Sequence, residues 1–311
     1  MPAMEERSLG DCIDEYLVYL ANVKGRSAHT VRAYAEDFKH FDGTISRETP
    51  IAFVSLSQLR SLVGNLSRAG YSIASIDRFI AAVRGLFAYC RKNQYIQENV
   101  SLELKTLKRP KLLPRFMTQA EVDALCSQPD RKPLLWPARD KALFEMLYSS
   151  GCRVSELASL KLADFTEGYE SAVVMGKGSK ERYVFFEQDA RDALQAYLLE
   201  RKERFPQSLT EGDAFVAEVF VNQRGGPLTT AGMELIVREY SGVKGTSKPM
   251  TPHSFRHTFA TAMLLNGADI REVQSMLGHS SINATQRYTH VTAERLREVY
   301  NQAFPHSGKE D

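Results

Sequence analysis

The residues of this chain that are best suited to chemistry lie between positions 251 and 291. His253, Arg256, His279 and Tyr288 occur there in the segments TPHSFRHTFAT, MLGHSS and TQRYTHV. A guanidinium donates two parallel hydrogen bonds to a phosphodiester and keeps its charge at physiological pH. A phenol has a pKa of about 10, so it needs neighbouring cations or a base to become a nucleophile near neutrality. Each residue alone is more often structural, but together they favour covalent phosphoryl transfer.

The pattern around His253 and Arg256 predicts a helix. Pro252 suits its first turn, and its end is expected at Asn266 and Gly267. The apolar residues recur at helical spacing and are Phe255, Phe259, Met263 and Leu264. The histidine and the arginine then share one face of this helix.

A second helix should follow and end at Gly278, which places His279 on a turn. Its apolar residues are Val273, Met276 and Leu277. A short third helix from about Ile282 should present Tyr288 near its end. The reactive groups of this region are then able to meet at one site.

A second arginine of the same character lies in the segment SSGCRVSELASLKLADF. Gly151 is expected to end one helix, and Arg153 to open the next. The apolar residues that should pack inward are Val154, Leu157 and Leu160. The Arg153 guanidinium would then face the same site as Arg256 and offer a second fork to a phosphate.

The segment VVMGKGSKERYVFF contains two β-rich runs around GKGS and predicts a hairpin with Lys177 at its tip. From there a lysine can enter a DNA groove and protonate a leaving oxygen as a general acid. A solvated turn is the alternative interpretation. The segment is not a phosphate-binding P-loop, because Ser171 stands at the first required glycine and no Ser or Thr follows Lys177.

In their order and spacing, these residues resemble the active-site signature of the tyrosine recombinases, the phage-type integrase family. The matching positions are Arg153, Lys177, His253, Arg256, His279 and Tyr288. The chain as a whole resembles the Xer type, including the segments RPKLLPRFMTQAEVDAL and YTHVTAERLREV. Cys152 departs from the more usual leucine before the first arginine, and it is a small apolar substitute.

The resemblance implies that Tyr288 attacks a scissile phosphate, stays joined to the DNA 3′ end and releases a 5′ hydroxyl. The two matched arginines would bind the non-bridging oxygens, where a metal ion often stands in phosphoryl transfer. Lys177 would protonate the leaving oxygen, His253 would assist proton transfer at the tyrosine, and His279 would donate a hydrogen bond to the phosphate. Two rounds of exchange through a Holliday junction are then expected to need neither metal, cofactor nor ATP.

The predicted fold class is mainly α with two domains. Four apolar stripes predict a four-helix bundle over residues 1–104, which the resemblance identifies as a SAM-like core-binding domain. Residues 105–117 are rich in Lys, Arg and Pro and are expected to form a basic linker. Residues 118–311 should form the catalytic domain, mostly helical with a small antiparallel sheet, and Thr118 with Glu121 begins it as a capping box.

The composition suits an ordinary globular protein, since 43% of the residues are hydrophobic and 25% are charged. No apolar run approaches a membrane span, and the first ten residues lack the apolar segment of a secretory signal, so a cytoplasmic, nucleoid-associated protein is expected. Four cysteines occur without a CxxC pair and are expected to be reduced and buried. They are Cys12, Cys90, Cys126 and Cys152.

The net charge is only +2, but residues 78–115 hold nine Lys or Arg against two Glu, which gives this stretch a charge of +7. Such a stretch can bind phosphates, although a solvated helix face is a common alternative. The candidate DNA-binding residues are Arg78, Arg84, Arg91, Lys92, Lys105, Lys108, Arg109 and Lys111.

The resemblance implies that the partner is double-stranded DNA with short inverted repeats, bound by a homotetramer or by a heterotetramer with a paralogous recombinase. The final helix carries an apolar stripe on an otherwise charged surface, formed by Leu296, Val299, Tyr300 and Ala303. Packing within its own domain is one interpretation, and cyclic donation to a neighbouring subunit is the hypothesis that the resemblance favours. A septal DNA translocase is a candidate activator.

The predicted function is site-specific recombination, with resolution of chromosome or plasmid dimers at a dif-like site as the favoured role. A mobile-element integrase and a type IB topoisomerase are alternatives with the same chemistry. A non-catalytic DNA-binding regulator should have lost a reactive group, and this chain keeps all six. A metal-dependent nuclease would need a carboxylate to complete a site at His253 and His257, and none lies nearby in the sequence.

Overall fold

The computed structural model describes residues 7–107, 116–132, 134–176, 181–209, 215–241, 250–278 and 292–305. Its contacts divide the chain into two compact units, Met1–Leu112 and Leu113–Asp311. Each unit has its own apolar core. The described part is mostly helical with a small antiparallel sheet, as the sequence predicts.

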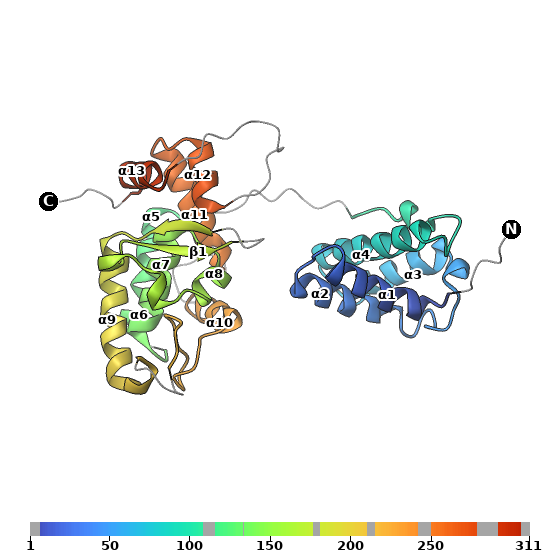
Figure 1. Cartoon of the computed structure of the whole chain (residues 1–311), viewed down its shortest axis with the longest axis horizontal. Helices are drawn as coiled ribbons and strands as arrows, with labels where there is room; N and C mark the ends of the chain where they lie inside the picture. Colours follow the sequence, from blue (N-terminus) through green and yellow to red (C-terminus); the bar gives the residue numbers. More distant parts are fainter. Residues whose placement is uncertain are drawn as a thin grey trace. The chain divides into compact units, whose positions relative to one another are not determined.

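Over residues 7–107, the N-terminal unit is a bundle of four helices (Figure 1). They are α1 (Leu9–Asn22), α2 (Ala28–Phe38), α3 (Leu56–Arg68) and α4 (Ile73–Lys92). Three short 3-10 turns accompany them, η1 (Lys39–Phe41), η2 (Ile51–Phe53) and η3 (Val100–Glu103). Each α-helix begins after a serine whose hydroxyl accepts a backbone N–H of the first turn, which satisfies a donor that the helix itself leaves unpaired. The four predicted helices are therefore confirmed.

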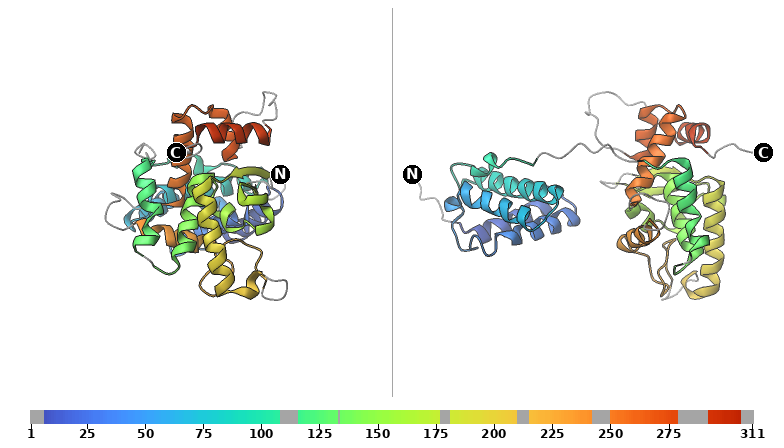
Figure 2. Two further views of the ribbon diagram at one scale, coloured as in Figure 1. Left: turned by 90° about the vertical axis from the view of Figure 1, so that its left-hand side faces the viewer. Right: turned by 180° about the vertical axis from the view of Figure 1, so that it is seen from behind.

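The C-terminal unit contains all the remaining elements within the described ranges. Its helices are α5 (Gln119–Cys126), α6 (Gln128–Arg131), α7 (Pro137–Ser150), α8 (Val154–Ala158), α9 (Gln188–Arg204), α10 (Thr230–Ser241), α11 (Pro252–Leu265), α12 (Ile270–Leu277) and α13 (Ala293–Ala303). Three 3-10 turns are η4 (Leu162–Asp164), η5 (Glu167–Tyr169) and η6 (Pro206–Leu209). Helix α7 is buried on almost every side and packs against α5, α6, α9, α10 and α11. The long α9 runs beside it in the views of Figures 1 and 2.

The two strands β1 (Ser171–Met175) and β2 (Glu181–Phe185) pair antiparallel, so the predicted hairpin is confirmed. The register runs from Ser171 opposite Phe185 to Met175 opposite Glu181. Alternate β2 residues face the core, which places Arg182 on the same side as Val184. This strand packs against α7, α12 and α13.

The C-terminal helix α13 lies on its own unit, against α11, α12 and β2. Its predicted apolar stripe is buried there, and the Tyr300 hydroxyl lies 2.8 Å from that of Ser149. Asn266 Nδ2 donates to the carbonyl oxygen of Ala303 over 2.8 Å. The stripe therefore has its partner surface within the chain, and donation to a neighbouring subunit would require α13 to leave this position.

All four cysteines are buried and free, as the sequence predicts.

Among the helices within the described ranges, none combines the length and apolar character needed to cross a bilayer.

We predict opposite effects for two helical glycines of the N-terminal unit. A methyl group at Gly85 on α4 would overlap the hydroxyl of Tyr16, a buried ring packed against Tyr89 and Phe38. Gly85→Ala should therefore lower the free energy of unfolding by about 1–3 kcal/mol in urea denaturation followed by circular dichroism. Gly64→Ala on α3 meets no atom within 4 Å. It should raise that free energy by about 0.5–1 kcal/mol, because alanine favours a helix over glycine. Equal stability of the two variants would show that Tyr16 does not define this packing.

Candidate active site

Two arginines from distant parts of the sequence meet at the ends of two helices. Gly151 ends α7 and Gly278 ends α12, both in the left-handed conformation, with φ of 57° and 64°. Arg256 Nη1 donates to the carbonyl oxygen of Gly151 over 2.8 Å, and its Nη2 donates to that of Leu277. Arg153 Nη2 makes a long contact of 3.5 Å to the carbonyl oxygen of Gly278. Both guanidiniums thus contact the end of α12, so the structure places them side by side, as expected from the sequence.

Both turns require glycine for two reasons. An L-residue is strained at positive φ. A Cβ at Gly151 would also come within 2.5 Å of Phe259 Cδ1, and one at Gly278 within 2.9 Å of Arg182 Cδ. Glycine therefore ends each helix where its last carbonyl groups can accept hydrogen bonds from the arginines.

Arg153 precedes the short helix α8 and is held by a buried carboxylate. Its backbone N–H donates to Glu156 Oε2 over 2.7 Å, and its Nη1 donates to Oε1 over 2.6 Å. The same Oε2 accepts a bond of 2.7 Å from Arg182 Nη2 on β2. Val154 is partly buried and Leu157 fully buried, as predicted, so α8 is anchored while its first arginine is directed to the site.

Three guanidiniums lie near one carboxylate, since Arg153 and Arg182 bond to Glu156 and the charge of Glu156 also acts on Arg256. We call Arg153, Arg182 and Arg256 the arginine cluster. The pKa of Arg256 is lowered to about 10, chiefly by burial and then by the neighbouring charges of Arg153 and Arg182, while the charge of Glu156 opposes these effects. A guanidinium with this pKa is still charged at neutral pH. The excess positive charge makes this region suited to an anion such as a phosphate.

His253 lies in the first turn of α11, one turn before His257. The two rings meet edge to face, with centroids 5.5 Å apart. Burial lowers the pKa of His253, and the charges of His257, Arg256 and Arg153 act in the same direction. A histidine with a lowered pKa is neutral at pH 7 and can accept a proton.

The rival interpretation of His253 and His257 as metal ligands gains no third ligand among the residues that the structure describes. Within the described ranges, no group of three His, Cys, Asp or Glu side chains is arranged to hold a metal ion. His257 instead contributes its ring to the packing beside His253.

Three of the predicted site residues, Lys177, His279 and Tyr288, lie outside the described residues. The short third helix expected from Ile282 lies outside them as well. The elements before two of them agree with the prediction. Strand β1 precedes Lys177, and Gly278 ends α12 directly before His279. Their roles therefore stay predictions.

The candidate DNA-binding residues of the N-terminal unit differ in their surroundings. Arg78 donates from Nε and Nη2 to both oxygens of the buried Asp37, each over 2.8 Å, and Arg84 donates to the carbonyl oxygen of Leu104. These two arginines stabilise the bundle, and their part in DNA binding stays a prediction.

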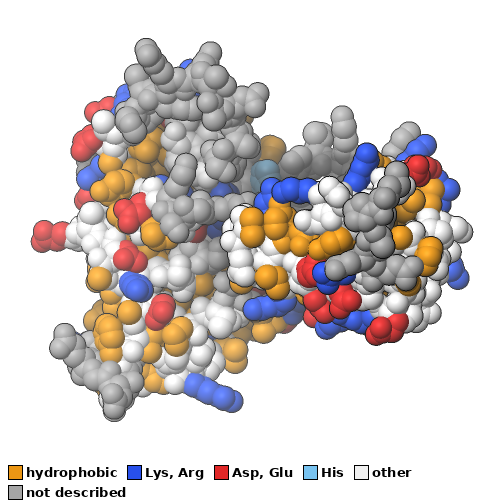
Figure 3. All heavy atoms as spheres, turned by 45° about the vertical axis from the view of Figure 1, so that its right-hand side comes forward, with side chains coloured by type: hydrophobic (Ala, Val, Ile, Leu, Met, Phe, Trp, Pro, Cys, Tyr) orange, Lys and Arg blue, Asp and Glu red, His pale blue; other side chains and the backbone are white. Residues whose placement is uncertain are grey.

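The remaining candidates show no common structural role. Lys92 lies over the ring of Tyr19, while Arg91 and Lys105 are exposed. Lys108, Arg109 and Lys111 lie outside the described residues. On the face of this unit seen in Figure 3, basic side chains are interspersed with acidic and apolar ones.

Two members of the site, Glu156 and Arg182, were not predicted from the sequence. Both carried a signal. Glu156 stands three positions after Arg153, where a carboxylate can accept the backbone N–H that precedes a helix. Arg182 occupies an inward position of a strand, where a charged residue needs a buried partner.

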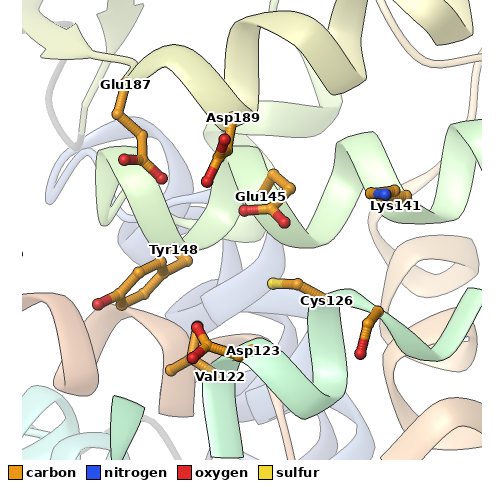
Figure 4. A pocket seen from close by; sticks show the side chains of 9 residues that line it. Val122, Asp123, Cys126, Lys141, Glu145, Tyr148, Glu187 and Asp189 are labelled. Atoms are coloured by element: carbon orange, nitrogen blue, oxygen red, sulfur yellow. The ribbon is translucent and has the colours of Figure 1, made fainter. Parts of the chain in front are cut away.

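A separate pocket of about 280 Å³ lies between α5, α7 and the start of α9 and has an acidic lining (Figure 4). Its carboxylates are Asp123, Glu145, Glu187 and Asp189. Burial, followed by the charge of Asp189, raises the pKa of Glu145 to about 7 and that of Glu187 to about 8. The pocket shares no residue with the arginine cluster, and its charge would repel a phosphate.

Comparison with protein families gives two matches that together span most of the chain. Residues 13–94 match the family described as phage integrase, N-terminal SAM-like domain, and residues 115–295 match the phage integrase family. The resemblance inferred from the six sequence positions is thereby confirmed.

Curated relatives agree over almost the whole chain. Tyrosine recombinase XerC of Treponema denticola is 37% identical over 305 residues, which cover 96% of this chain and 100% of the relative. Tyrosine recombinase XerD of Listeria innocua is 35% identical over 300 residues, which cover 96% of this chain and 99% of the relative.

Solved structures show the same fold at lower identity. A λ integrase fragment, determined as a dimer bound to a COC′ core site, has a TM-score of 0.68 and 17% identity over 92% of this chain and 100% of that chain. The Tn1549 transposon integrase with circular intermediate DNA has a TM-score of 0.69 and 20% identity over 94% of this chain and 98% of that chain. The predicted fold class, including the SAM-like N-terminal domain, is confirmed.

The acidic pocket predicts how stability depends on pH. The carboxyl groups of Glu145 and Glu187 have raised pKa values in the folded chain, against 4.5 as the ordinary value. The folded state therefore keeps protons that the unfolded state has already lost, so stability falls as pH rises from about 4.5 to about 8. Glu187→Gln removes one of these charges. It should raise the melting temperature clearly at pH 8.5 and little at pH 5, with a stabilisation on the order of a few kcal/mol at the higher pH.

A matched control is Glu234→Gln on α10, because that side chain is exposed. It should leave the pH dependence of melting as in the parent chain. A Glu187→Gln variant that melts with the parent pH dependence would contradict the inferred ionisation of this pocket.

Proposed function

This chain belongs to the phage integrase family and is a tyrosine recombinase, an enzyme that breaks and rejoins DNA, and we propose that Tyr288 is its nucleophile. We further propose that Arg153 and Arg256 bind the scissile phosphate. The observation that supports this most is the meeting of both guanidiniums at the helix ends of Gly151 and Gly278. Together with Arg182 they leave more positive charge than Glu156 compensates, which suits the developing charge of a phosphoryl-transfer transition state.

In the proposed reaction, the Tyr288 oxygen attacks phosphorus and the bond from phosphorus to the 5′ oxygen breaks. The product is a 3′-phosphotyrosine, and the 5′ oxygen leaves as a hydroxyl with a proton from Lys177. The phenol proton passes to His253, and His279 donates a hydrogen bond to the phosphate. Attack by a 5′ hydroxyl of a partner duplex reverses the chemistry and joins new strands, since the phosphotyrosine conserves the phosphoester bond.

The surroundings of His253 support its proposed role. A proton acceptor must be neutral before the reaction, and burial together with the adjacent cations lowers the pKa of this imidazole. The arginine cluster therefore has two effects, since it binds an anion and also keeps the neighbouring base unprotonated.

The biological reaction that we propose is resolution of chromosome or plasmid dimers at a dif-like site with short inverted repeats. The XerC and XerD names of the relatives and their nearly full-length match support this role. We propose a tetramer on DNA, of one recombinase or of two paralogues, and a septal DNA translocase as a possible activator. A λ integrase of the same fold was determined as a tetramer bound to a Holliday junction. Exchange of α13 between subunits belongs to this proposal, and it requires α13 to leave its position against α11, α12 and β2 of its own chain.

Two other roles share this chemistry. A mobile-element integrase would join its own element's ends, and a type IB topoisomerase would relax supercoiled plasmid without a specific site. A nicked suicide substrate that carries candidate chromosomal inverted repeats tests the proposal directly, because cleavage traps the covalent adduct and peptide mapping identifies the nucleophile. Site-independent relaxation would favour the topoisomerase, and cleavage only at the ends of a mobile element would favour the integrase.

Tyr288→Phe should bind the DNA site normally and form no covalent adduct, because only the phenol oxygen is lost. Adduct formation on the suicide substrate is measured by denaturing electrophoresis, and binding by a gel shift. Tyr183→Phe is the matched control, since this exposed tyrosine on β2 should still give the adduct. An adduct in the Tyr288→Phe variant would mean that another residue is the nucleophile.

Arg256→Lys should slow adduct formation by roughly 100-fold or more, because removal of one oriented donor costs about this factor in related transition states. A lysine keeps the charge, but its single nitrogen cannot serve the carbonyl groups of Gly151 and Leu277 together with a phosphate. Arg271→Lys, an exposed position on α12, should react as the parent does. If Arg256→Lys cleaved at the parent rate, the proposal that the Arg256 guanidinium binds the phosphate through more than one nitrogen would be contradicted.

A further inference from the structure

Arg182 links the elements of the arginine cluster, although it matches none of the signature positions. Its side chain is 9% exposed, and its partner Glu156 is 3% exposed. The two residues lie 26 positions apart, on β2 and α8, and are joined by the 2.7 Å bond from Arg182 Nη2 to Glu156 Oε2. The other oxygen accepts from Arg153 Nη1, while the Arg153 backbone N–H shares Oε2 with Arg182. One buried carboxylate therefore bridges two guanidiniums from separate elements.

The second guanidinium is not needed to neutralise the carboxylate, because Arg153 alone already supplies one positive charge to Glu156. Arg182 instead adds a like charge beside Arg256, whose pKa its presence lowers. Because Arg182 increases the repulsion between buried cations, local charge balance does not account for its position here.

The geometry shows what Arg182 does to Arg153. Because Oε2 accepts from Arg182 Nη2 and from the Arg153 backbone N–H, the Arg153 guanidinium binds the carboxylate through Nη1 alone and directs Nη2 toward the carbonyl oxygen of Gly278. Without Arg182, Glu156 Oε2 would keep only the Arg153 backbone N–H and could accept a further bond from the Arg153 guanidinium, since carboxylates bind such a fork in a bidentate way. Arg153 would then turn further toward Glu156 and away from a phosphate.

Arg182 also lies directly against the turn that ends α12. A Cβ at Gly278 would come within 2.9 Å of its Cδ and 3.0 Å of its Nε. Its Nε and Nη1 are buried and make no hydrogen bond with the described residues, so Glu156 is the one described group that holds this guanidinium by hydrogen bonds. The connection from β2 to the cluster thus passes through a single carboxylate.

We propose that Arg182 is a positioning residue for recombination, which orients Arg153 by competing for Glu156 and supports the turn at Gly278. This inference rests on the proposed function, in which Arg153 binds the scissile phosphate. Arg182 acts through Glu156 and need not touch the DNA.

The test is a double-mutant cycle between Arg182→Gln and Glu156→Gln in the full chain. Single-turnover adduct formation on the nicked suicide substrate is measured beside DNA affinity and melting temperature. Arg182→Gln should slow adduct formation by roughly 10- to 100-fold, because a misplaced phosphate-binding group costs about this much, and should change affinity by less than about 3-fold. In the Glu156→Gln background the same substitution should have almost no further effect, since residues that act through one another are not additive.

Two further variants separate positioning from simple folding. Arg182→Lys should react at an intermediate rate, because an ammonium can hold one oxygen of Glu156 but has no planar fork to lie under Gly278. Arg191→Gln is the matched control, since Arg191 on α9 is also partly buried, pairs with Glu170 and has a buried Nε that bonds to none of the described residues. It should cleave as the parent does. If Arg182→Gln fails to melt cooperatively, the double-mutant cycle is measured with Arg182→Lys in its place, and non-additivity with Glu156→Gln then tests the inference.

Parent-like adduct formation by Arg182→Gln, or effects of the two substitutions that multiply, would overturn the inference. A parent chain that forms no adduct at Tyr288 would instead overturn the proposed function, so the two failures are distinguishable.

Discussion

The candidate site depends on hydrogen bonds between arginine side chains and the carbonyl groups that two helices leave unpaired at their ends. The last carbonyl groups of a helix have no partner within it. At Gly151, Leu277 and Gly278 these groups accept from Arg256 and Arg153. The bonds fix two flexible side chains at the junction of α7, α8, α11 and α12, and they do so without neutralising the charge that a phosphate requires.

The packing around the turn at Gly151 connects this turn to the C-terminal helix α13. The ring of Phe259 lies where a side chain at Gly151 would stand, and it also packs against Tyr300 and Phe304 of the C-terminal segment. Tyr300 in turn contacts Ser149, two residues before the turn. The position of α13 is therefore coupled through packed rings to the turn that binds Arg256. A rearrangement of α13 between subunits would act on this same layer of the core.

Charge is distributed unequally within the unit. The arginine cluster holds three cations, two of them bonded to Glu156, whereas the pocket beside α5 holds four carboxylates, two of them with strongly raised pKa values. Burial disfavours the charged form of the side chains in both regions, so it lowers the pKa of an arginine and raises that of a carboxyl group. Only the first region suits a phosphate.

Much of this protein follows from its sequence, because the relevant forces are local. Serine caps, the capping boxes at Ser55 and Thr118, the glycines at helix ends and the alternation around GKGS depend on residues a few positions apart. These local patterns determined the helices and the hairpin, and the order of the reactive residues can be seen in the sequence directly. The tertiary structure decided what each side chain contacts. Arg256 meets a carbonyl group 105 positions away, Arg182 meets Glu156, and Arg78 meets Asp37 inside the bundle instead of remaining free. Such contacts arise only when separate elements pack, since no local pattern specifies which buried charge will find which partner.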